Sequence, residues 1–250
     1  MREIVDIVLF NNEIELLDLR VKILEDVVDR FIIKESIETF QGQPKECLAS
    51  TYEHPKVQSF LIGSFPGSTW ERERFQRSIK VDLEAWVVSK DAIILTSDLD
   101  EVPNPEALKW MKENFNPDAM YAFDQKMFQY YLNVRNLDEE WSGTRACSVE
   151  KYNHIDAEYL RQSKHLCLLL PDSGWHWSFL GGFEAIKQKI ESYSHEEYNN
   201  EETLSQITTR LFNNEDVFDR GFRLETVELD SSFPKYILEN QEKLAHLIKR

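Results

Sequence analysis

Residues 4–34 read IVDIVLFNNEIELLDLRVKILEDVVDRFIIK, and this stretch decides the fold class. Ile4 to Phe10 is a short apolar run, which is typical of a buried strand. Asn11-Asn12-Glu13 then looks like the start of a helix, and apolar residues between 14 and 28 recur at helical spacing. A second apolar run, Phe31 to Lys34, follows. The order strand, helix, strand predicts a βαβ unit with a parallel pair of strands.

The rest of the chain continues as further strands and helices. We expect strands at 57–62 and 92–96, with a helix from Trp70 to Val88 between them. Residues 133–165 are polar and are expected to be irregular. The other expected elements are strands at 119–123, 127–132 and 166–170, and helices at 105–115, 183–193, 202–212 and 235–248. Since no repeat or linker is evident, we expect one α/β domain over residues 1–250, with a Rossmann-like, mixed and mostly parallel sheet flanked by helices.

The composition narrows the class of protein. The chain has 250 residues and a formal net charge of -16, which disfavours nucleic acid and anionic membranes as partners because phosphate contacts need clustered Lys and Arg. Cys47, Cys147 and Cys167 form no CxxC pair, so free thiols in a reducing compartment are expected. The first residues do not look like a signal peptide, and no apolar run approaches the ~18 residues of a membrane span. We expect a soluble, cytoplasmic protein, which would lie at the inner membrane surface only through a lipid-linked molecule that it binds.

An acidic motif, Ser97-Asp98-Leu99-Asp100-Glu101, follows the expected strand at 92–96. Open parallel sheets bind ligands at the carboxyl ends of their strands. Carboxylates two residues apart on extended backbone share a face, so Asp98 and Asp100 can converge on one hard cation such as Mg²⁺ or Mn²⁺. Such an ion offsets the charge that grows on a diphosphate leaving group. For an isolated D-x-D, an acidic turn before the helix near Pro103 is the simpler interpretation.

Several stretches of the chain occur together in one known family. They are FNNEIELLDLRVKILEDVVDRFIIKES (10–36), ERERFQR (71–77), IILTSDLDEVPNPEAL (93–108), GWHWSFLGG (174–182) and KIESYSHEEYN (189–199). In this order they resemble glycosyltransferase family 17, whose animal member adds N-acetylglucosamine to N-glycans. The resemblance implies a GT-A fold, an inverting mechanism, a UDP-sugar donor (commonly UDP-N-acetylglucosamine) and Mn²⁺ or Mg²⁺. We expect residues 1–101 to bind this nucleotide-sugar and residues 102–250 to bind a glycan acceptor.

Candidate donor-binding residues lie near the ends of the expected strands. Asn11 is placed where a nucleotide rests in a GT-A sheet, while Asn12 is more simply a helix cap. Glu35 ends the second strand and, by similarity to GT-A enzymes, accepts hydrogen bonds from the uracil or ribose, unless it is only a solvated strand end. Arg74 and Arg77 share a helix face, and guanidinium groups grip diphosphate oxygens bidentately. Pairing with neighbouring glutamates is the alternative for both arginines.

A histidine is the expected third metal ligand beside Asp98 and Asp100, because GT-A enzymes often add one from the C-terminal half. His176 and His195 are the two candidates, and the sequence does not rank them. His176 lies between Trp175 and Trp177, which alternation places together on the opposite face. The mechanism expected from the resemblance gives Asp100 the metal and Asp98 either the metal or the ribose.

An inverting transfer also needs a general base for the acceptor hydroxyl. Glu184, after Gly181-Gly182-Phe183, fits the helix start where related enzymes hold an acid, and ordinary first-turn charge is the alternative. Asp172 and Asp124 are the reserve candidates. Aromatic faces stack on sugar rings. The aromatic residues expected to line the acceptor groove are Phe128, Tyr130, Tyr131, Trp141 and Trp177.

Two other functions fit parts of this pattern. Residues 98–102 match the D-x-D-x-[TV] motif of haloacid-dehalogenase phosphatases, in which the first Asp is a nucleophile. That family carries the motif on its first strand, whereas about three expected strands precede it here. A non-catalytic carbohydrate-binding module would keep the aromatic residues but would not need Asp98, Asp100 and Arg77.

Overall fold

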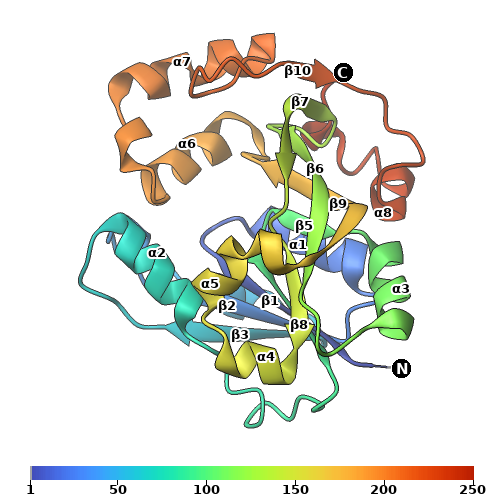
Figure 1. Cartoon of the computed structure of the whole chain (residues 1–250). Helices are drawn as coiled ribbons and strands as arrows, with labels where there is room; N and C mark the ends of the chain where they lie inside the picture. The colour runs from blue at the N-terminus through green and yellow to red at the C-terminus, as the bar shows by residue number, and fades with distance from the viewer. Residues whose placement is uncertain (1) are drawn as a thin grey trace.

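The computed structural model describes residues 2–250 and has a mixed β-sheet with helices on both faces (Figure 1). Its first half is a parallel sheet in the order β3-β2-β1-β4. The elements are β1 (Ile4–Phe10), α1 (Ile14–Leu24), β2 (Arg30–Ser36), β3 (Val57–Ile62), α2 (Thr69–Ser78) and β4 (Ile93–Asp98). The predicted βαβ unit, its parallel pair and the α/β class are therefore confirmed.

The second half of the sheet is mainly antiparallel. It consists of β5 (Glu101–Pro103), β6 (Tyr121–Gln129), β7 (Val134–Trp141), β8 (Arg145–Ser148), β9 (Leu168–Ser178) and β10 (Leu224–Thr226). β8 joins the halves by pairing antiparallel with both β4 and β6, whereas β9 runs parallel to β6. The strands predicted at 119–123 and 127–132 are largely one strand, β6. The strand predicted at 166–170 is longer than expected, because β9 continues to Ser178 across an irregularity in register.

Two sequence predictions about local structure are wrong. Residues 133–165 are not irregular, because they hold β7, β8, α4 (Val149–His154) and α5 (Ala157–Gln162). These helices are too short to show a hydrophobic period, and β7 is half exposed, so it lacks an apolar run. The helix predicted from 70 to 88 ends at Ser78, because Val81 and Leu83 leave the helix to fill the core against the sheet.

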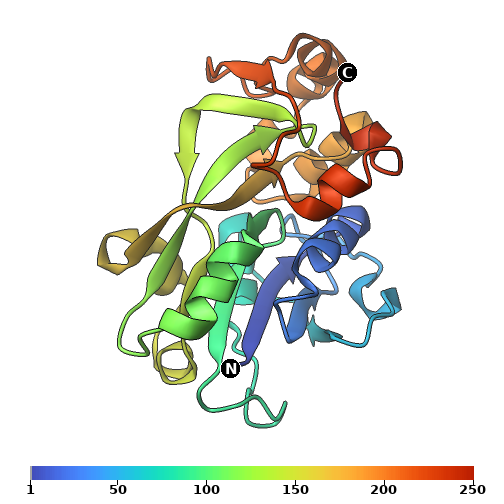
Figure 2. The ribbon, with the colours of Figure 1, turned by 90° about the vertical axis from the view of Figure 1, so that its right-hand side faces the viewer.

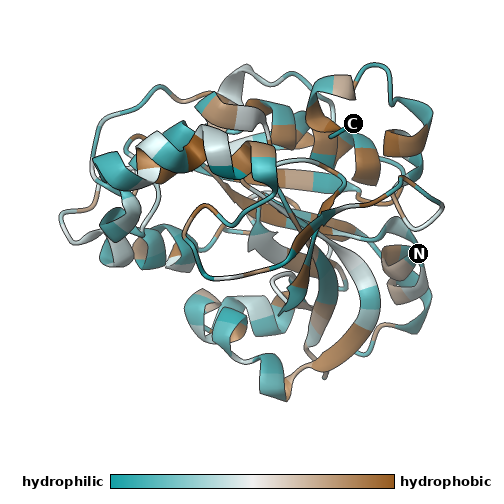
Figure 3. Ribbon diagram, turned by 90° about the horizontal axis from the view of Figure 1, so that it is seen from above, coloured by the Kyte–Doolittle hydropathy of each residue, from teal (hydrophilic) through white to brown (hydrophobic). Residues whose placement is uncertain are grey.

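The helices form separate layers over the sheet. α1, α3 (Pro105–Asn114) and α8 (Lys235–Glu239) cover one face, and α4 and α5 cover the other. α6 (Gly182–Ser192) and α7 (Glu201–Asn213) pack on the far ends of β6 and β7, in the upper part of Figures 1 and 2. Hydrophobic and hydrophilic residues alternate along these helices (Figure 3), as in amphipathic cover helices. No helix within residues 2–250 has both the length and the apolar character that crossing a membrane requires.

The predicted last helix, 235–248, is shorter than expected. α8 ends at Glu239, and only a single 3₁₀ turn, Ala245–Leu247, follows it.

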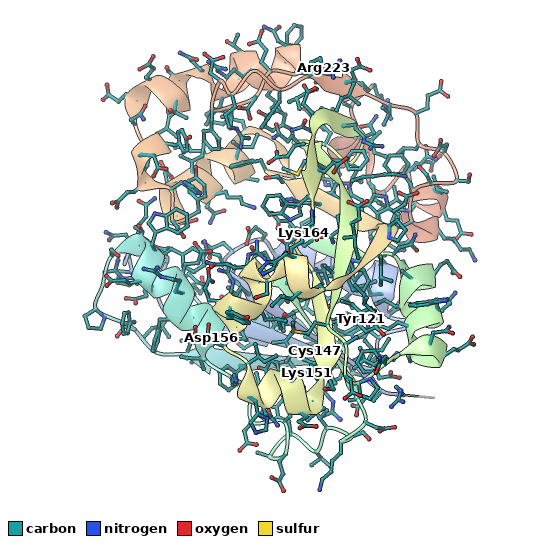
Figure 4. All side chains as sticks on the ribbon, viewed as in Figure 1. Tyr121, Cys147, Lys151, Asp156, Lys164 and Arg223 are labelled. Carbon is teal, nitrogen blue, oxygen red and sulfur yellow. The ribbon has the colours of Figure 1, made fainter. Side chains whose placement is uncertain are left out.

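The thiol of Cys147 lies inside the sheet on β8 (Figure 4), where burial raises its pKa to about 12. Cys47, Cys147 and Cys167 are all free thiols, as the sequence predicts.

A buried ion pair ties α1 to the end of β4. Arg20 and Asp6 are both fully buried, and the guanidinium binds the two carboxylate oxygens at 2.8 Å each. The same guanidinium donates to the carbonyl oxygens of Leu99 at 3.1 Å and Glu101 at 2.7 Å, and to the hydroxyl of Ser97 at 2.8 Å. One side chain of the first helix therefore fixes the backbone that carries the acidic motif.

We predict that Arg20→Met lowers the free energy of unfolding by about 3–5 kcal/mol, because it leaves Asp6 as an uncompensated buried charge. Urea denaturation followed by circular dichroism measures this loss. Lys22→Met is the matched control on the same helix, since Lys22 is one third exposed and pairs with Glu25 at 3.6 Å. It should change stability by less than about 1 kcal/mol. Equal losses in the two variants would refute the role of the buried pair.

Candidate functional site

A cleft of about 420 Å³ opens at the carboxyl ends of β1 and β4. In the sheet register, Leu9 lies beside Asp98 and Phe10 lies beside Glu35, so these strands end at one edge. Of the residues predicted from sequence, the lining includes Asn11, Arg77, Asp98, Asp100, Trp141, His176 and His195. The cleft therefore gathers the acidic motif with residues from both halves of the chain.

The two aspartates of the motif have different neighbours. Asp98 lies 3.0 Å from Arg77 and 2.7 Å from Arg161. Asp100 lies 2.7 Å from the Lys189 ammonium and 3.3 Å from His176 Nε2. Burial opposes ionisation of both groups, yet the neighbouring cations outweigh it and hold the pKa of each carboxyl below its usual range. Both aspartates are thus anionic at neutral pH, and cations already surround them.

Glu101, for which the sequence predicted no role, lies beneath these pairs. Its buried carboxylate accepts from the Asp98 backbone N–H at 3.0 Å, from Trp141 Nε1 at 2.8 Å and from Arg161 at 2.9 Å. Gly143 packs directly against it, since a Cβ at that position would lie 2.0 Å from the Glu101 side chain. Glu101 therefore sets the position of Trp141 and Arg161 in the cleft wall.

The arginine of α2 that faces the cleft is Arg77. It also contacts Glu73 at 2.8 Å and Glu158 at 3.0 Å. The ammonium of Lys34 donates to the carbonyl oxygen of Arg77 at 2.9 Å, and burial together with the charge of Arg77 lowers the pKa of Lys34 to about 7. Arg74 is exposed and lies outside the cleft lining.

Of the other candidate donor-binding residues, Asn11 lines the cleft and Glu35 does not. Asn11 lines the cleft, and its amide donates to the hydroxyl of Ser192 at 2.8 Å. Asn12 is not the helix cap, because the N-cap of α1 is Glu13, whose side chain makes no capping hydrogen bond. Glu35 is buried and does not line the cleft. Its carboxylate accepts from the backbone N–H groups of Leu48 and Ala49, at 3.0 and 2.8 Å, and binds Lys45.

Both candidate histidines line the cleft, but in different surroundings. His176 is buried beside Trp141, with ring centroids 4.6 Å apart, and its Nδ1 has no hydrogen-bond partner among the described residues. His195 is half exposed, packs edge-on against Trp70 at 4.5 Å and contacts Glu197 at 2.7 Å. Only His176 therefore lies next to an aspartate of the motif.

The predicted general bases lie outside the cleft lining. Glu184 is an exposed residue in the first turn of α6, so it matches the alternative interpretation as first-turn helix charge. Asp172 forms an ion pair with Lys126 at 2.7 Å. Asp124 makes only a long contact, 3.5 Å, with the backbone N–H of Asp172. The structure does not bring any of them together with the acidic motif.

Of the aromatic residues predicted for the acceptor groove, only Trp141 lines the cleft. Trp177 stacks on Trp175, as alternation predicted, and both belong to the core together with Phe128. The Tyr130 hydroxyl is used internally, where it accepts from the backbone N–H of Val217 at 2.6 Å. Other aromatic residues form the wall instead, namely Phe10, Phe40, Trp70, Phe179, Tyr193 and Phe218.

Sequence reasoning also missed several charged residues of the cleft. Arg161 and Glu158 belong to α5, which Asp156 caps with hydrogen bonds of 3.0 Å to two backbone N–H groups (Figure 4). Glu139 comes from β7, in the stretch expected to be irregular. The signal for Lys189 was present, because it begins the stretch KIESYSHEEYN.

The side chains around Asp100 offer two donor atoms for a metal ion. Within residues 2–250, no group of three or more His, Cys, Asp and Glu side chains is arranged to hold a metal. Asp100 and His176 nevertheless offer an oxygen and a nitrogen 3.3 Å apart. Mg²⁺ is commonly held by one or two carboxylates plus substrate phosphates, so this pair can serve as the protein's share of the ligands. Asp98 instead forms ion pairs with Arg77 and Arg161.

We predict an energetic coupling of about 1–3 kcal/mol between Lys189 and Asp100, because the pair is shielded from water and in contact. A double-mutant cycle of Lys189→Met and Asp100→Asn, measured by urea unfolding, gives this value. Lys187 and Glu191 form the matched control on the same helix, with a separation of 3.9 Å and more than 40% exposure. Their coupling should stay at about 0.3–0.5 kcal/mol. If both couplings were equally small, Asp100 would not be held by Lys189.

Comparisons with known proteins show the family of the chain. Over residues 1–220 the chain matches the model of glycosyltransferase family 17. It is 23% identical over 296 residues to beta-1,4-mannosyl-glycoprotein 4-beta-N-acetylglucosaminyltransferase of Rattus norvegicus, covering 99% of this chain and 55% of that protein. The human protein of the same name is 23% identical over 295 residues, with the same coverage. The chain thus spans about half the length of these relatives.

Similarity to solved structures is weaker. S. aureus TarS 1-349 is 12% identical, with a TM-score of 0.43 over 84% of this chain and 72% of that one. 4-Diphosphocytidyl-2C-methyl-D-erythritol synthase is 15% identical, with a TM-score of 0.42 over 68% of this chain and 89% of that one. The family match covers most of the chain and includes the strand that ends in the acidic motif. This protein belongs to glycosyltransferase family 17.

Proposed function

We propose that this chain is an inverting, metal-dependent GT-A glycosyltransferase that moves N-acetylglucosamine from a UDP-sugar to a hydroxyl of a glycan. The observation that carries the proposal is the pair Asp98 and Asp100 at the end of β4, surrounded by cations in one cleft. The family membership supports glycosyl transfer as the reaction. We also propose one catalytic domain, in which residues 1–101 bind most of the donor and residues 102–250 form most of the acceptor site, with Arg161, His176 and Lys189 reaching the donor diphosphate.

The cations of the cleft suit a diphosphate leaving group. Arg77, Arg161 and Lys189 approach the motif from α2, α5 and α6, and all three line the cleft. Charge grows on the diphosphate oxygens as the bond to the sugar breaks, so nearby guanidinium and ammonium groups favour the transition state. Bound at Asp100 and His176, Mn²⁺ or Mg²⁺ would supply additional positive charge to the same oxygens. Lys189 would then leave Asp100 and bind the diphosphate instead.

The aromatic wall suits the sugars. Trp70 is 43% exposed, and Trp141 faces the cleft from the other side with its indole N–H held by Glu101. Tyr193 adds a buried hydroxyl without a hydrogen-bond partner among residues 2–250, in the lining of the same cleft. Flat aromatic faces pack on the apolar side of a pyranose ring, and an unpaired hydroxyl can bond a sugar hydroxyl. We assign the glycan acceptor to this wall.

The two alternative functions receive less support. The phosphatase motif belongs on a first strand, whereas here it ends β4, a central strand between β1 and β8. Its nucleophile would be Asp98, which is held by two arginines. A carbohydrate-binding module has no need of the ionised pair and its cations. Neither alternative accounts for the charges in the cleft.

We expect UDP to bind this protein in isothermal titration, with higher affinity when Mn²⁺ is present. Asp100→Asn should remove the gain from Mn²⁺, because it takes away the carboxylate that faces His176. Both Asp98→Asn and Asp100→Asn should reduce transfer by at least about 100-fold without unfolding the chain. If wild-type protein bound no UDP with or without Mn²⁺, the UDP-sugar assignment would be wrong.

A matched pair of arginines tests where the diphosphate binds. Arg77→Gln should weaken UDP binding by about 1.5–3 kcal/mol, or roughly 10- to 100-fold, because it removes a charged hydrogen-bond donor from the cleft. Arg74→Gln, on the same helix but outside the cleft lining, should leave the dissociation constant within about twofold. Equal effects of the two substitutions on UDP titration would argue against this location.

A further inference from the structure

All but one of the carboxylates that line the cleft have a cationic nitrogen within 4.0 Å. Asp98 and Asp100 are held as described above, and Glu73 and Glu158 both bind Arg77. Glu13 lies 3.8 Å from Lys189. A carboxylate in contact with a cation has fewer free lone pairs with which to receive a substrate hydroxyl. The contacts of these residues are therefore already taken by side chains of the cleft wall.

The remaining carboxylate is Glu139. It lines the cleft, is partly exposed and forms no ion pair within residues 2–250. Its side chain receives only a long contact, 3.4 Å, from the amide of Asn136. Arg220 also lines the cleft and is affected by the charge of Glu139, but its guanidinium is bound to Asp216 at 2.7 and 2.9 Å. Glu139 is thus an acid with free lone pairs facing the cleft.

Its place on β7 puts it on the same strand face as Trp141. Glu139 and Trp141 are two residues apart on the strand and share a face, and Trp141 packs on His176, the neighbour of Asp100. The adjacent acids differ. Glu140 is exposed and lies outside the cleft lining, while Asp138 is bound by Arg223 at 2.6 Å, at the top of Figure 4. Only the middle acid of this run therefore reaches the cleft.

We propose that Glu139 is the general base of the transfer, an inference that rests on the proposed function. The Glu139 carboxylate takes the proton of the acceptor hydroxyl as the acceptor oxygen forms its bond to the anomeric carbon. The bond between that carbon and the β-phosphate oxygen breaks, and UDP leaves with the electron pair. The anomeric configuration inverts, and the proton remains on Glu139 until it is released to solvent. Trp141, on the same face, holds the acceptor ring beside the carboxylate.

The test is Glu139→Gln with Glu140→Gln as the matched control. UDP release is measured with UDP-N-acetylglucosamine as donor, with a panel of p-nitrophenyl glycosides or water as acceptor. A general base contributes about 100- to 10,000-fold, so kcat of Glu139→Gln should fall by that factor. Its dissociation constant for UDP should stay within about twofold of wild type, as should all parameters of Glu140→Gln. Glu139→Asp, which keeps a carboxylate, should retain more kcat than Glu139→Gln.

The outcomes separate the two proposals. If wild type releases UDP and Glu139→Gln keeps more than about a tenth of its kcat, the base assignment is overturned while the proposed function stands. A rise in acceptor KM with unchanged kcat would also overturn it, because Glu139 would then only bind the acceptor. If wild type releases no UDP from any nucleotide-sugar tested, the proposed function fails and the assignment of Glu139 fails with it.

Discussion

The position of the turn after β4 depends on Arg20, a side chain that never reaches the cleft. Arg20 satisfies the buried Asp6 of β1 and binds the backbone carbonyl oxygens on both sides of Asp100. Holding the carbonyl group of Glu101 also places the side chain of that residue. The N–H of Asp98 then bonds to Glu101, which in turn orients Arg161 and Trp141. Packing of the first helix on the first strand is thus transmitted to the cleft wall.

Positively charged side chains gather in the cleft although the chain as a whole is acidic. The formal net charge is -16, yet Arg77, Arg161 and Lys189 converge on the motif. An acidic surface of this kind repels free nucleotides at long range, whereas closely placed cations bind them at short range. Ion pairs with the motif's aspartates hold the two arginines and the lysine in position. The positions of a few cationic side chains, and not the net charge of the chain, therefore decide which charges a diphosphate would meet in the cleft.

The sequence predicts the parallel half of the fold well and the antiparallel half poorly. β1, β2 and β4 each contain a buried apolar run because both faces of this part of the parallel sheet are covered, and the ends of β1 and β4 place Asn11 and the motif at one edge. β7 is half exposed, so Glu139 and Trp141 sit in a stretch that reads as irregular. The sequence suggests roles for Glu35 and Glu184 only through their positions at a strand end and at a helix start. Contacts distant in sequence decide their surroundings, such as the backbone of residues 48–49 that binds Glu35.

The long strand β9 limits how the molecule can move. It pairs with β5 and β6 and carries His176 opposite Glu101, while the backbone N–H of Trp177 bonds to the carbonyl oxygen of Asp100. A hinge between the two halves of the sheet would have to break the pairing of β8 with β4 and the hydrogen bond from Trp177 to Asp100. Gly181 and Gly182 follow β9 with φ angles of +114° and +78°, which suits them to absorb backbone rotation. A swing of α6 about these two glycines would widen the cleft without breaking the sheet, and it would carry Lys189 away from Asp100.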